Sequence, residues 1–242
     1  MAEAYIVAAA RTAGGRKGGR LSGWHPADLS AQVLNALLDR SGADPAVVDD
    51  VIMGCVTQTG EQAFNIARTA VLASRLPESV PGTSVDRQCG SSQQALHFAA
   101  QAVMSGSMDV VIAAGVESMS RVPMGTNVVL PQKAGMGHYM SPAMRERYPD
   151  VQEFSQFVGA EMLVSKYGLD KDQLDAYALS SQQRAIEATR AGRFADEIVP
   201  VEAILHDGTR TGELHTVDEG IRFDTSLEAI QGVQPLREGG SI

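Results

Sequence analysis

The chain has 242 residues, of which 44% are hydrophobic, 20% charged and 5% aromatic, as in an ordinary globular protein. This composition excludes collagen-like, coiled-coil and disordered classes. Twenty Lys and Arg residues against 29 Asp and Glu residues leave a net charge of −9, which argues against broad binding to nucleic acid or an anionic membrane. Two cysteines give no disulfide framework, and no apolar run approaches the ~20 residues that span a bilayer. We therefore expect a cytoplasmic protein without a signal peptide or membrane segment.

Short apolar runs alternate with helical patterns along the first part of the chain, which is typical of an α/β fold with mainly parallel strands. The uninterrupted apolar run at 110–115 predicts a strand buried on both faces. Apolar residues surround much of the helix predicted at 90–105, which indicates burial on nearly all sides. In chain order, the patterns predict strands at 5–9, 51–56, 84–85 and 110–115, and helices at 27–39, 65–74 and 90–105.

The amino-acid composition changes at about residue 118, and Pro, Gly and Met are frequent from there through residue 149. Amphipathic helices are then predicted at 154–166 and 171–191, followed by a strand at 198–204. The segment 207–220 is polar and rich in turn residues. A second region is therefore expected from residue 118 onward.

Cys89 is the most informative residue, because it stands where a predicted strand ends and a helix begins. The partial positive charge and unpaired N–H groups of a helix N-terminus favour a thiolate, and they can bind an oxyanion. A packing role is the alternative, since free cysteines are usually buried and inert. Placement alone leaves both interpretations open.

The other candidate groups give little chemistry. Cys55 lies within an apolar run and is interpreted as a packing residue. None of the five histidines has metal-site spacing or an obvious general-base position, so no metal is expected; they are His25, His97, His138, His206 and His215.

Five segments resemble motifs of the thiolases, the family of acetyl-CoA acetyltransferases and 3-ketoacyl-CoA thiolases, and they occur in the family's order. The segment around Cys89, DRQCGSSQQA, resembles the nucleophile motif, and AGVESMS at 114–120 resembles the G-G-x-E-S-M-S signature. The remaining matches are 10–12 with 18–21, 54–58 through 65–68, and 192–194 to 197–201.

The resemblance implies a thiolase-like α/β fold, with an N-terminal domain over 1–117 and a loop domain that holds CoA and a return strand over 118–242. It implies that Cys89 takes an acyl group from one CoA thioester and passes it to a second acceptor, which divides a difficult step into two. The backbone N–H of Cys89 contributes to the oxyanion hole. No permanently bound cofactor is implied, because coenzyme A thioesters are the substrates.

The resemblance also assigns CoA contacts and partners. Arg222 matches a family position beside the nucleotide end of CoA, with a solvated surface arginine as the alternative. Ser155 and Gln156 fall near another CoA contact of the family. A homodimer or homotetramer is implied, with acyl-CoA and CoA as ligands and no nucleic acid or membrane partner.

Several catalytic elements of the family have no counterpart in residues 1–242. The missing groups are the G-H-P histidine that activates the nucleophile, the C-x-G-G-G cysteine that acts as acid and base, and an asparagine that holds a water. The Gly23–Pro26 segment contains an intervening tryptophan, so its similarity to G-H-P is interpreted as coincidence. We therefore expect a truncated thiolase, or a chain whose nucleophile helix is covered by something else.

Three functions are compatible with these observations. The first is thiolase-type acyl transfer, by thiolysis of a 3-oxoacyl-CoA or by condensation to acetoacetyl-CoA. The second is a CoA-binding or assembly fragment that does not turn over. The third is a ketoacyl-synthase-like condensing enzyme, against which the motif Glu117–Ser120 argues. The segments 58–62 and 88–94 are more similar to degradative lipid or sterol thiolases than to acetoacetyl-CoA-forming ones.

Overall fold

The chain forms two compact units in a computed structural model that describes residues 3–242. The first unit runs to Ala134 and resumes over Asp196–Gly220, and the second comprises Gly135–Ala195 and Ile221–Ile242. The division into domains at residue 117 stays a prediction.

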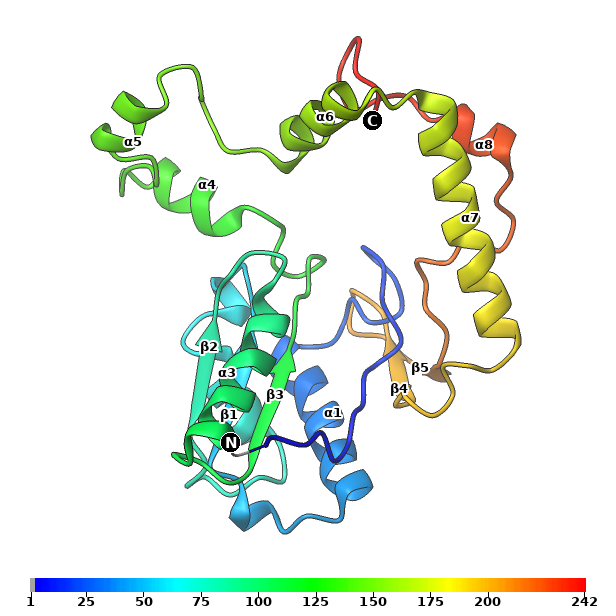
Figure 1. Cartoon of the computed structure of the whole chain (residues 1–242). Coiled ribbons are helices and arrows are strands. Elements are labelled where there is room, and N and C mark those ends of the chain that lie inside the picture. Colours follow the sequence, from blue (N-terminus) through cyan, green and yellow to red (C-terminus); the bar gives the residue numbers. More distant parts are fainter. Residues whose placement is uncertain (1–2) are drawn as a thin grey trace. The chain divides into compact units, whose positions relative to one another are not determined.

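Three parallel strands form the sheet of the first unit, in the order β2-β1-β3 (Figure 1). The central strand β1 covers Asp50–Gly54 and pairs with β2 (Gly82–Val85) on one side and β3 (Val111–Gly115) on the other. The three strands predicted at 51–56, 84–85 and 110–115 are therefore confirmed. The parallel sheet and its helices confirm the α/β class.

Helices cover both faces of this sheet because successive side chains of β1 point in opposite directions. Val51 and Met53 belong to the core that α1 (Pro26–Ser41) and α2 (Ile66–Ala73) share with the sheet. Ile52 faces the other way and packs with Ala95 and Ala99 of α3 (Ser91–Ser105). All three helices lie where the sequence predicts them, to within a few residues.

The predicted burial of α3 and β3 is only partly right. In α3 only Ser91, Ala95 and Ala99 are buried, and the apolar side chains of Leu96, Phe98 and Met104 are 40–48% exposed. The reason is that α3 packs chiefly against the strands within the described residues, so its outer face has no cover there. In β3 only Ile112 is buried, because this strand is at the edge of the sheet.

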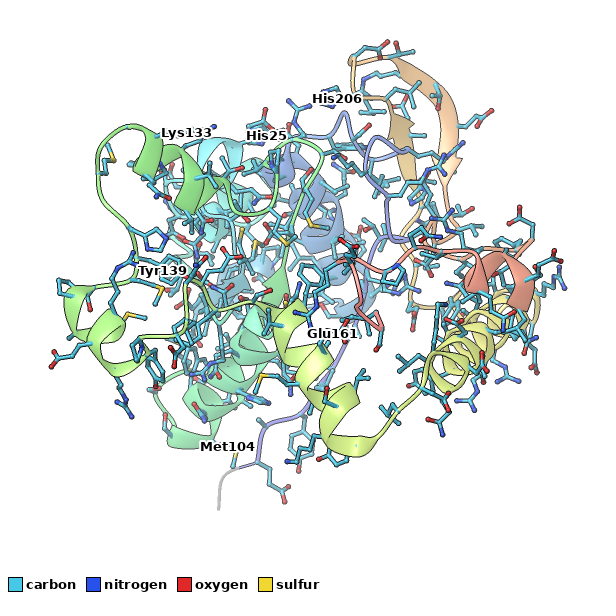
Figure 2. The ribbon with its side chains drawn as sticks, turned by 90° about the horizontal axis from the view of Figure 1, so that it is seen from above. His25, Met104, Lys133, Tyr139, Glu161 and His206 are labelled. Atoms are coloured by element: carbon cyan, nitrogen blue, oxygen red, sulfur yellow. The ribbon has the colours of Figure 1, made fainter. Side chains whose placement is uncertain are left out.

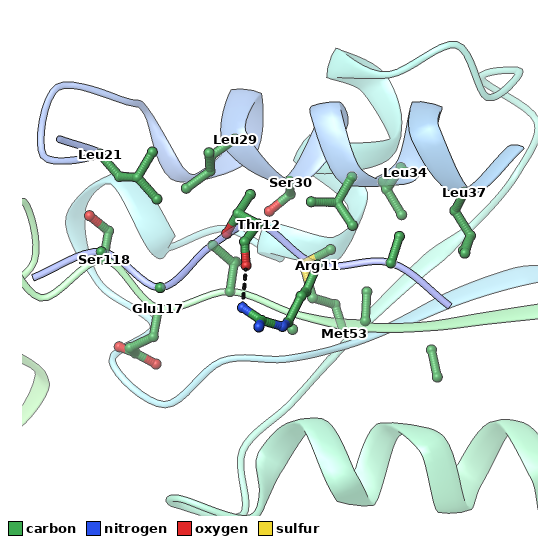
Figure 3. Close-up of a pocket in the computed structure, with 18 of the residues that line it drawn as sticks. Arg11, Thr12, Leu21, Leu29, Ser30, Leu34, Leu37, Met53, Glu117 and Ser118 are labelled. Carbon is green, nitrogen blue, oxygen red and sulfur yellow. Dashed lines mark hydrogen bonds between the residues drawn. The ribbon is translucent and has the colours of Figure 1, made fainter. Parts of the chain in front are cut away.

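The segment predicted as a strand at 5–9 is not one, and Tyr5, Ile6 and Val7 are exposed. A cavity of about 610 Å³ lies between this segment, α1 and β3, within the first unit (Figure 3). The cavity separates the segment from the edge of the sheet, so its backbone groups do not reach the β3 ladder. The apolar pattern was correct, but a strand also requires a pairing partner.

The segment Asp196–Gly220, where the chain returns to the first unit, is hydrogen-bonded to the N-terminal segment at Arg11. The backbone N–H of Arg11 donates to Glu197 and its carbonyl accepts from Val199. The Arg11 guanidinium donates to Glu197 Oε1 and to Asp218 Oδ1, both at 2.7 Å. Beyond this contact, β4 (Val201–Ile204) and β5 (Arg210–His215) form an antiparallel pair. The strand predicted at 198–204 is confirmed over β4, whereas β5 lies in a segment where only turns were expected.

Two carboxylates occupy the Gly-rich loop at 13–20. Asp218 accepts a hydrogen bond from the backbone N–H of Gly14, and Glu219 accepts from those of Arg16 and Arg20. These N–H groups resemble an anion-binding nest, but side chains of the same chain fill it. The loop is therefore a structural connection.

The second unit is helical, with α5 over Pro142–Arg147, α6 over Gln156–Tyr167, α7 over Lys171–Arg190 and α8 over Leu227–Gln231. Helix α7 packs against α8. Glu161 of α6, labelled in Figure 2, is buried and accepts hydrogen bonds from the backbone N–H groups of Ser241 and Ile242.

The remaining elements, in the first unit, are α4 Thr126–Lys133 and the 3₁₀ turns Pro45–Val47 and Gly60–Gln62. Helices α6 and α7 confirm the two helices predicted at 154–166 and 171–191, whereas α4, α5 and α8 were not predicted.

The ion pair of Arg11 with Asp218 leads to a prediction about stability. Hydrogen bonding to Arg11 holds the pKa of Asp218 below its ordinary value, so the carboxylate stabilises the fold above about pH 4 and this contribution is lost as the pH falls further. We expect Asp218→Asn to reduce the free energy of unfolding at pH 7 by about 1–3 kcal/mol. Denaturant unfolding followed through the fluorescence of Trp24, the single tryptophan, measures this change.

The matched control is Glu213→Gln, because the ion pair of Glu213 with Arg20 is largely exposed to solvent. Such a pair contributes at most about 1 kcal/mol. Equal losses in the two variants would contradict the role given to Asp218. The difference between wild type and Asp218→Asn must also shrink as the pH falls below about 4.

Candidate functional site

Cys89 lies in a tight turn that connects β2 to α3, at the carboxyl end of the parallel sheet (Figure 1). Strand β2 ends at Val85, and α3 begins at Ser91 with Gly90 as its N-cap. The predicted position of the cysteine between a strand and a helix is therefore confirmed. Open parallel sheets characteristically place ligands at the carboxyl ends of their strands.

The turn is held in an unusual backbone conformation. Gln88 has a φ of 48°, in the left-handed region that residues with a side chain rarely adopt. The Asp86 carboxylate accepts from the N–H of Gln88 at 2.8 Å. Ser91 Oγ accepts from the N–H of Arg87 at 2.9 Å and donates to the carbonyl of Gln88 at 2.6 Å. Such conformations cost about 1–3 kcal/mol and occur preferentially at functional sites.

The Cys89 thiol is exposed at the start of a fifteen-residue helix. No side chain caps this helix, because the N-cap residue is Gly90. The N–H groups of Gly90 and Ser91 donate to the carbonyls of Arg87 and Gln88. The remaining N–H dipoles of a helix start of this kind favour an anion, such as a thiolate or an oxyanion. This arrangement can perform nucleophilic attack on a carbonyl and stabilise the resulting charge.

Two glycines allow the start of α3 to lie directly on the sheet. A Cβ atom at Gly54, the last residue of β1, would be 2.3 Å from the backbone N of Ser92. A Cβ atom at Gly115, the last residue of β3, would be 1.9 Å from Ser92 Oγ. Any other residue at position 54 would displace the first turn of α3, because the contact is with backbone atoms. At position 115 the Ser92 hydroxyl can rotate, but the new Cβ would still be 2.9 Å from Ser92 Cβ. The glycines therefore determine where the turn that carries Cys89 sits.

A polar network connects the loops that follow β1 and β3. The Glu117 carboxylate accepts from the N–H groups of Val56 at 2.8 Å and Thr57 at 3.2 Å, and from Gln62 Nε2 at 3.0 Å. Gln62 Oε1 accepts from the N–H of Ser118 at 2.6 Å. No sequence pattern predicts these contacts, because Gln62 and Glu117 are 55 residues apart. The only hint in the sequence was that Gln62 and Glu117 both lie within the motif segments.

Cys55, the second cysteine, is buried in the core, which confirms its interpretation as a packing residue. Burial raises the pKa of the Cys55 thiol to about 12, and the nearby charge of Glu117 acts in the same direction. Cys55 therefore stays protonated at neutral pH and is a poor nucleophile.

The predicted CoA contacts all belong to the second unit. Ser155 is the N-cap of α6 and makes no side-chain capping hydrogen bond, and Gln156 is the first residue of that helix. Arg222 is exposed, and its backbone N–H donates to the side chain of Gln182 at 2.8 Å. Within residues 3–242, no hydrogen bond or ion pair joins Arg222 to Ser155 or Gln156. Their role stays a prediction.

The cavity of about 610 Å³ is not assigned to this site, because Cys89 is not among the residues that line it.

No group of three or more His, Cys, Asp or Glu side chains in the described part of the chain could hold a metal ion. Among the described residues, no helix combines the length and apolar character needed to cross a bilayer.

Comparison with known proteins gives a consistent result. The family "Thiolase, N-terminal domain" matches residues 4–242. The steroid 3-ketoacyl-CoA thiolase FadA6 of Mycobacterium tuberculosis is 48% identical over 100% of this chain and 58% of its own length. The 3-ketoacyl-CoA thiolases of Erwinia tasmaniensis and Bacillus subtilis are 41% and 38% identical over 97% of this chain, and over 58% and 59% of their own lengths. The chain thus spans less than two thirds of these relatives.

The contact at Gly54 gives a prediction. We expect Gly54→Ala to destabilise the first unit by about 1–3 kcal/mol, because the added methyl group meets the backbone of Ser92 and that backbone cannot rotate away. The control is Gly90→Ala, where φ is −92° and the nearest atom to a new Cβ, the Arg87 carbonyl oxygen, is at an ordinary 3.5 Å. Denaturant unfolding followed by Trp24 fluorescence compares the two variants. A loss confined to Gly90→Ala would contradict the packing described.

Proposed function

The chain belongs to the thiolase family and corresponds to its N-terminal domain, and on this basis we propose that Cys89 is the nucleophile of an acyl transfer between CoA thioesters. The observation that carries the proposal is the strained turn that exposes Cys89 at the uncapped start of α3. The relatives named 3-ketoacyl-CoA thiolase favour thiolysis of a 3-oxoacyl-CoA as the direction of the whole protein.

The acyl transfer balances in two steps. The Cys89 thiolate attacks the 3-keto carbon of a 3-oxoacyl-CoA, the C2–C3 bond breaks, and the C2 carbanion takes up a proton to leave as acetyl-CoA. The shortened acyl group stays on Cys89 as a thioester. The thiol of free CoA then attacks this thioester, gives up its proton and releases the new acyl-CoA together with the Cys89 thiolate. N–H groups at the start of α3 stabilise the oxyanion of each tetrahedral intermediate.

Coenzyme A is the ligand that this proposal requires, and we place its contacts at Ser155, Gln156 and Arg222. A guanidinium such as that of Arg222 suits the phosphate groups at the nucleotide end of CoA, because it donates in a bidentate geometry. Ser155 and the first residue of α6 can donate to polar groups of the same ligand, since no side chain caps this helix. The proposal includes a homodimer or homotetramer in the cytoplasm.

Acetyl-CoA provides the first test, because thioester exchange with Cys89 requires no carbon–carbon cleavage. We expect the 242-residue chain to gain one acetyl group, located on Cys89 by peptide mapping and intact mass measurement. Cys89→Ser should gain none. Cys55→Ser should be acylated like wild type, since the Cys55 thiol is buried and its pKa is raised to about 12.

Absence of an adduct on folded wild-type chain would refute the proposal and favour a CoA-binding fragment that performs no transfer. Faster acylation from an acyl-carrier-protein thioester than from acetyl-CoA would favour a condensing enzyme of the ketoacyl-synthase type. For the whole protein, acetyl-CoA release is compared between a linear and a ring-bearing 3-oxoacyl-CoA. Faster release from the ring-bearing substrate would indicate steroid thiolysis, and faster release from the linear one would indicate general thiolysis.

CoA binding gives a separate prediction. We expect Arg222→Ala to weaken CoA binding about tenfold or more, measured by isothermal titration calorimetry, because a charge-assisted hydrogen bond contributes about 1.5–3 kcal/mol. Arg184→Ala is the matched control, since Arg184 is an exposed arginine of α7 in the same unit. Ser155→Ala and Gln156→Ala should produce smaller losses, because the groups removed are neutral. Equal affinities of Arg222→Ala and wild type would remove Arg222 from the site.

A further inference from the structure

The geometry points to Gln62 and Glu117 as positioning residues that hold the sheet end on which the Cys89 turn rests, an inference that rests on the proposed role of Cys89. Neither side chain is proposed to touch the substrate. Both act through β1 and β3, whose last residues, Gly54 and Gly115, support the first turn of α3.

Glu117 joins the ends of β1 and β3. Its carboxylate lies beyond the end of β3 and accepts hydrogen bonds from the chain that follows β1, at the N–H groups of Val56 and Thr57. The backbone N–H of Val116 also donates to the carbonyl of Gly54 at 3.0 Å. The parallel ladder therefore continues past its last residue pair by means of a side chain, and the ends of β1 and β3 cannot separate without breaking these bonds.

The side chain of Gln62 is completely buried between the same two loops. Its Nε2 donates to the Thr57 carbonyl at 2.9 Å and to Glu117 Oε1 at 3.0 Å, and its Oε1 accepts from the N–H of Ser118 at 2.6 Å. Each end of the amide has a partner of the correct type, which fixes its orientation. Gln62 thus holds the loops after both strands at a fixed separation. A buried polar network that is fully satisfied makes such a region rigid.

The network of Gln62 and Glu117 reaches the Cys89 turn through Ser92. Ser92, three residues after the nucleophile, lies against both Gly54 and Gly115, so it contacts the ends of the two strands that the network joins. A change in the separation of these ends therefore moves the surface beneath Ser92. Ser91 and Asp86 hold the turn internally, and the network determines the support below it. Without this support, the N–H groups of α3 lose their alignment with the acyl carbonyl.

The role differs from simple stabilisation of the fold, since Glu117 also raises the pKa of Cys55 together with burial. Burial is the larger cause of this rise in the pKa of Cys55, and the Glu117 carboxylate adds to it. A negative charge is needed for this effect, whereas a neutral hydrogen-bond acceptor would be sufficient for packing. This distinction guides the choice of variants.

The test compares Gln62→Met and Glu117→Gln with wild type. Gln62→Met keeps the length of the side chain and removes all three hydrogen bonds, whereas Glu117→Gln keeps the shape and replaces an acceptor by a donor that faces an N–H group. The matched control is Gln58→Met, because Gln58 Nε2 donates to the Cys55 carbonyl in the same loop without contacting Glu117. Thermal unfolding followed by Trp24 fluorescence identifies a temperature at which every variant is folded, and the rates are measured at that temperature.

Two rates are measured on Cys89 by peptide mass spectrometry. The first is single-turnover acylation by saturating acetyl-CoA, which we expect to fall at least tenfold in Gln62→Met and Glu117→Gln, with the half-saturating concentration changed less than twofold. The second is alkylation by iodoacetamide, which needs no CoA binding and should fall at least threefold. Gln58→Met should stay within twofold of wild type in both measurements.

The outcomes separate the two proposals. Absence of acylation in wild type would remove the proposed function. Unchanged rates in folded Gln62→Met and Glu117→Gln, with wild type acylated, would overturn the positioning role alone. A rise in the half-saturating concentration with an unchanged saturating rate would also overturn it, because positioning acts on the reaction step. Should Gln62→Met not fold, Glu117→Gln provides the same decision.

Discussion

The close approach of α3 to the sheet is the constraint on which the candidate site depends. Positions 54 and 115 lack a Cβ atom, and the backbone of Ser92 and its hydroxyl occupy that space. Because the helix begins so close to the strand ends, its N–H dipoles are directed to the carboxyl edge of the sheet, where Cys89 is exposed. The left-handed conformation of Gln88 is held by the hydrogen bonds that its N–H donates to Asp86 and its carbonyl accepts from Ser91.

The two cysteines show how the environment decides the chemistry of one residue type. Cys55 directly follows β1 and Cys89 lies four residues after β2, so both belong to the same end of the sheet. The side chain of Cys55 is enclosed by the core and lies close to a carboxylate, and both effects favour the neutral thiol. Cys89, by contrast, is exposed at the start of α3. The two thiols therefore differ in their access to solvent and to reactants because of where the fold places them.

The sequence predicts those features that depend on neighbouring residues. The period of the apolar residues located α1, α2, α3, α6 and α7, and the chemistry of Arg87–Ser92 located the turn. The three parallel strands were also predicted, but other features that depend on distant partners were missed or wrong. The segment at 5–9 has the composition of a strand but lies across a cavity from β3, and β5 forms in a polar segment because β4 pairs with it. The contact of Gln62 with Glu117 spans 55 residues, and although both residues lie within the motif segments, nothing in a single sequence pairs them.

The shape of the Cys89 turn depends on contacts between residues close in sequence, whereas its position depends on contacts between residues far apart. The hydrogen bonds that shape the turn of Cys89 join residues no more than four apart, so they form wherever that segment can bend. The support beneath the turn joins residues about 60 apart, through Glu117 and the pairing of β1 with β3. A shorter chain that ends before β3 would keep the strained turn that carries Cys89, but it would lack the strand that fixes the position of this turn. If Cys89 acts as the proposed nucleophile, its alignment therefore requires the sheet to be complete through residue 118, since only then do the start of α3 and the thiol have a fixed common support.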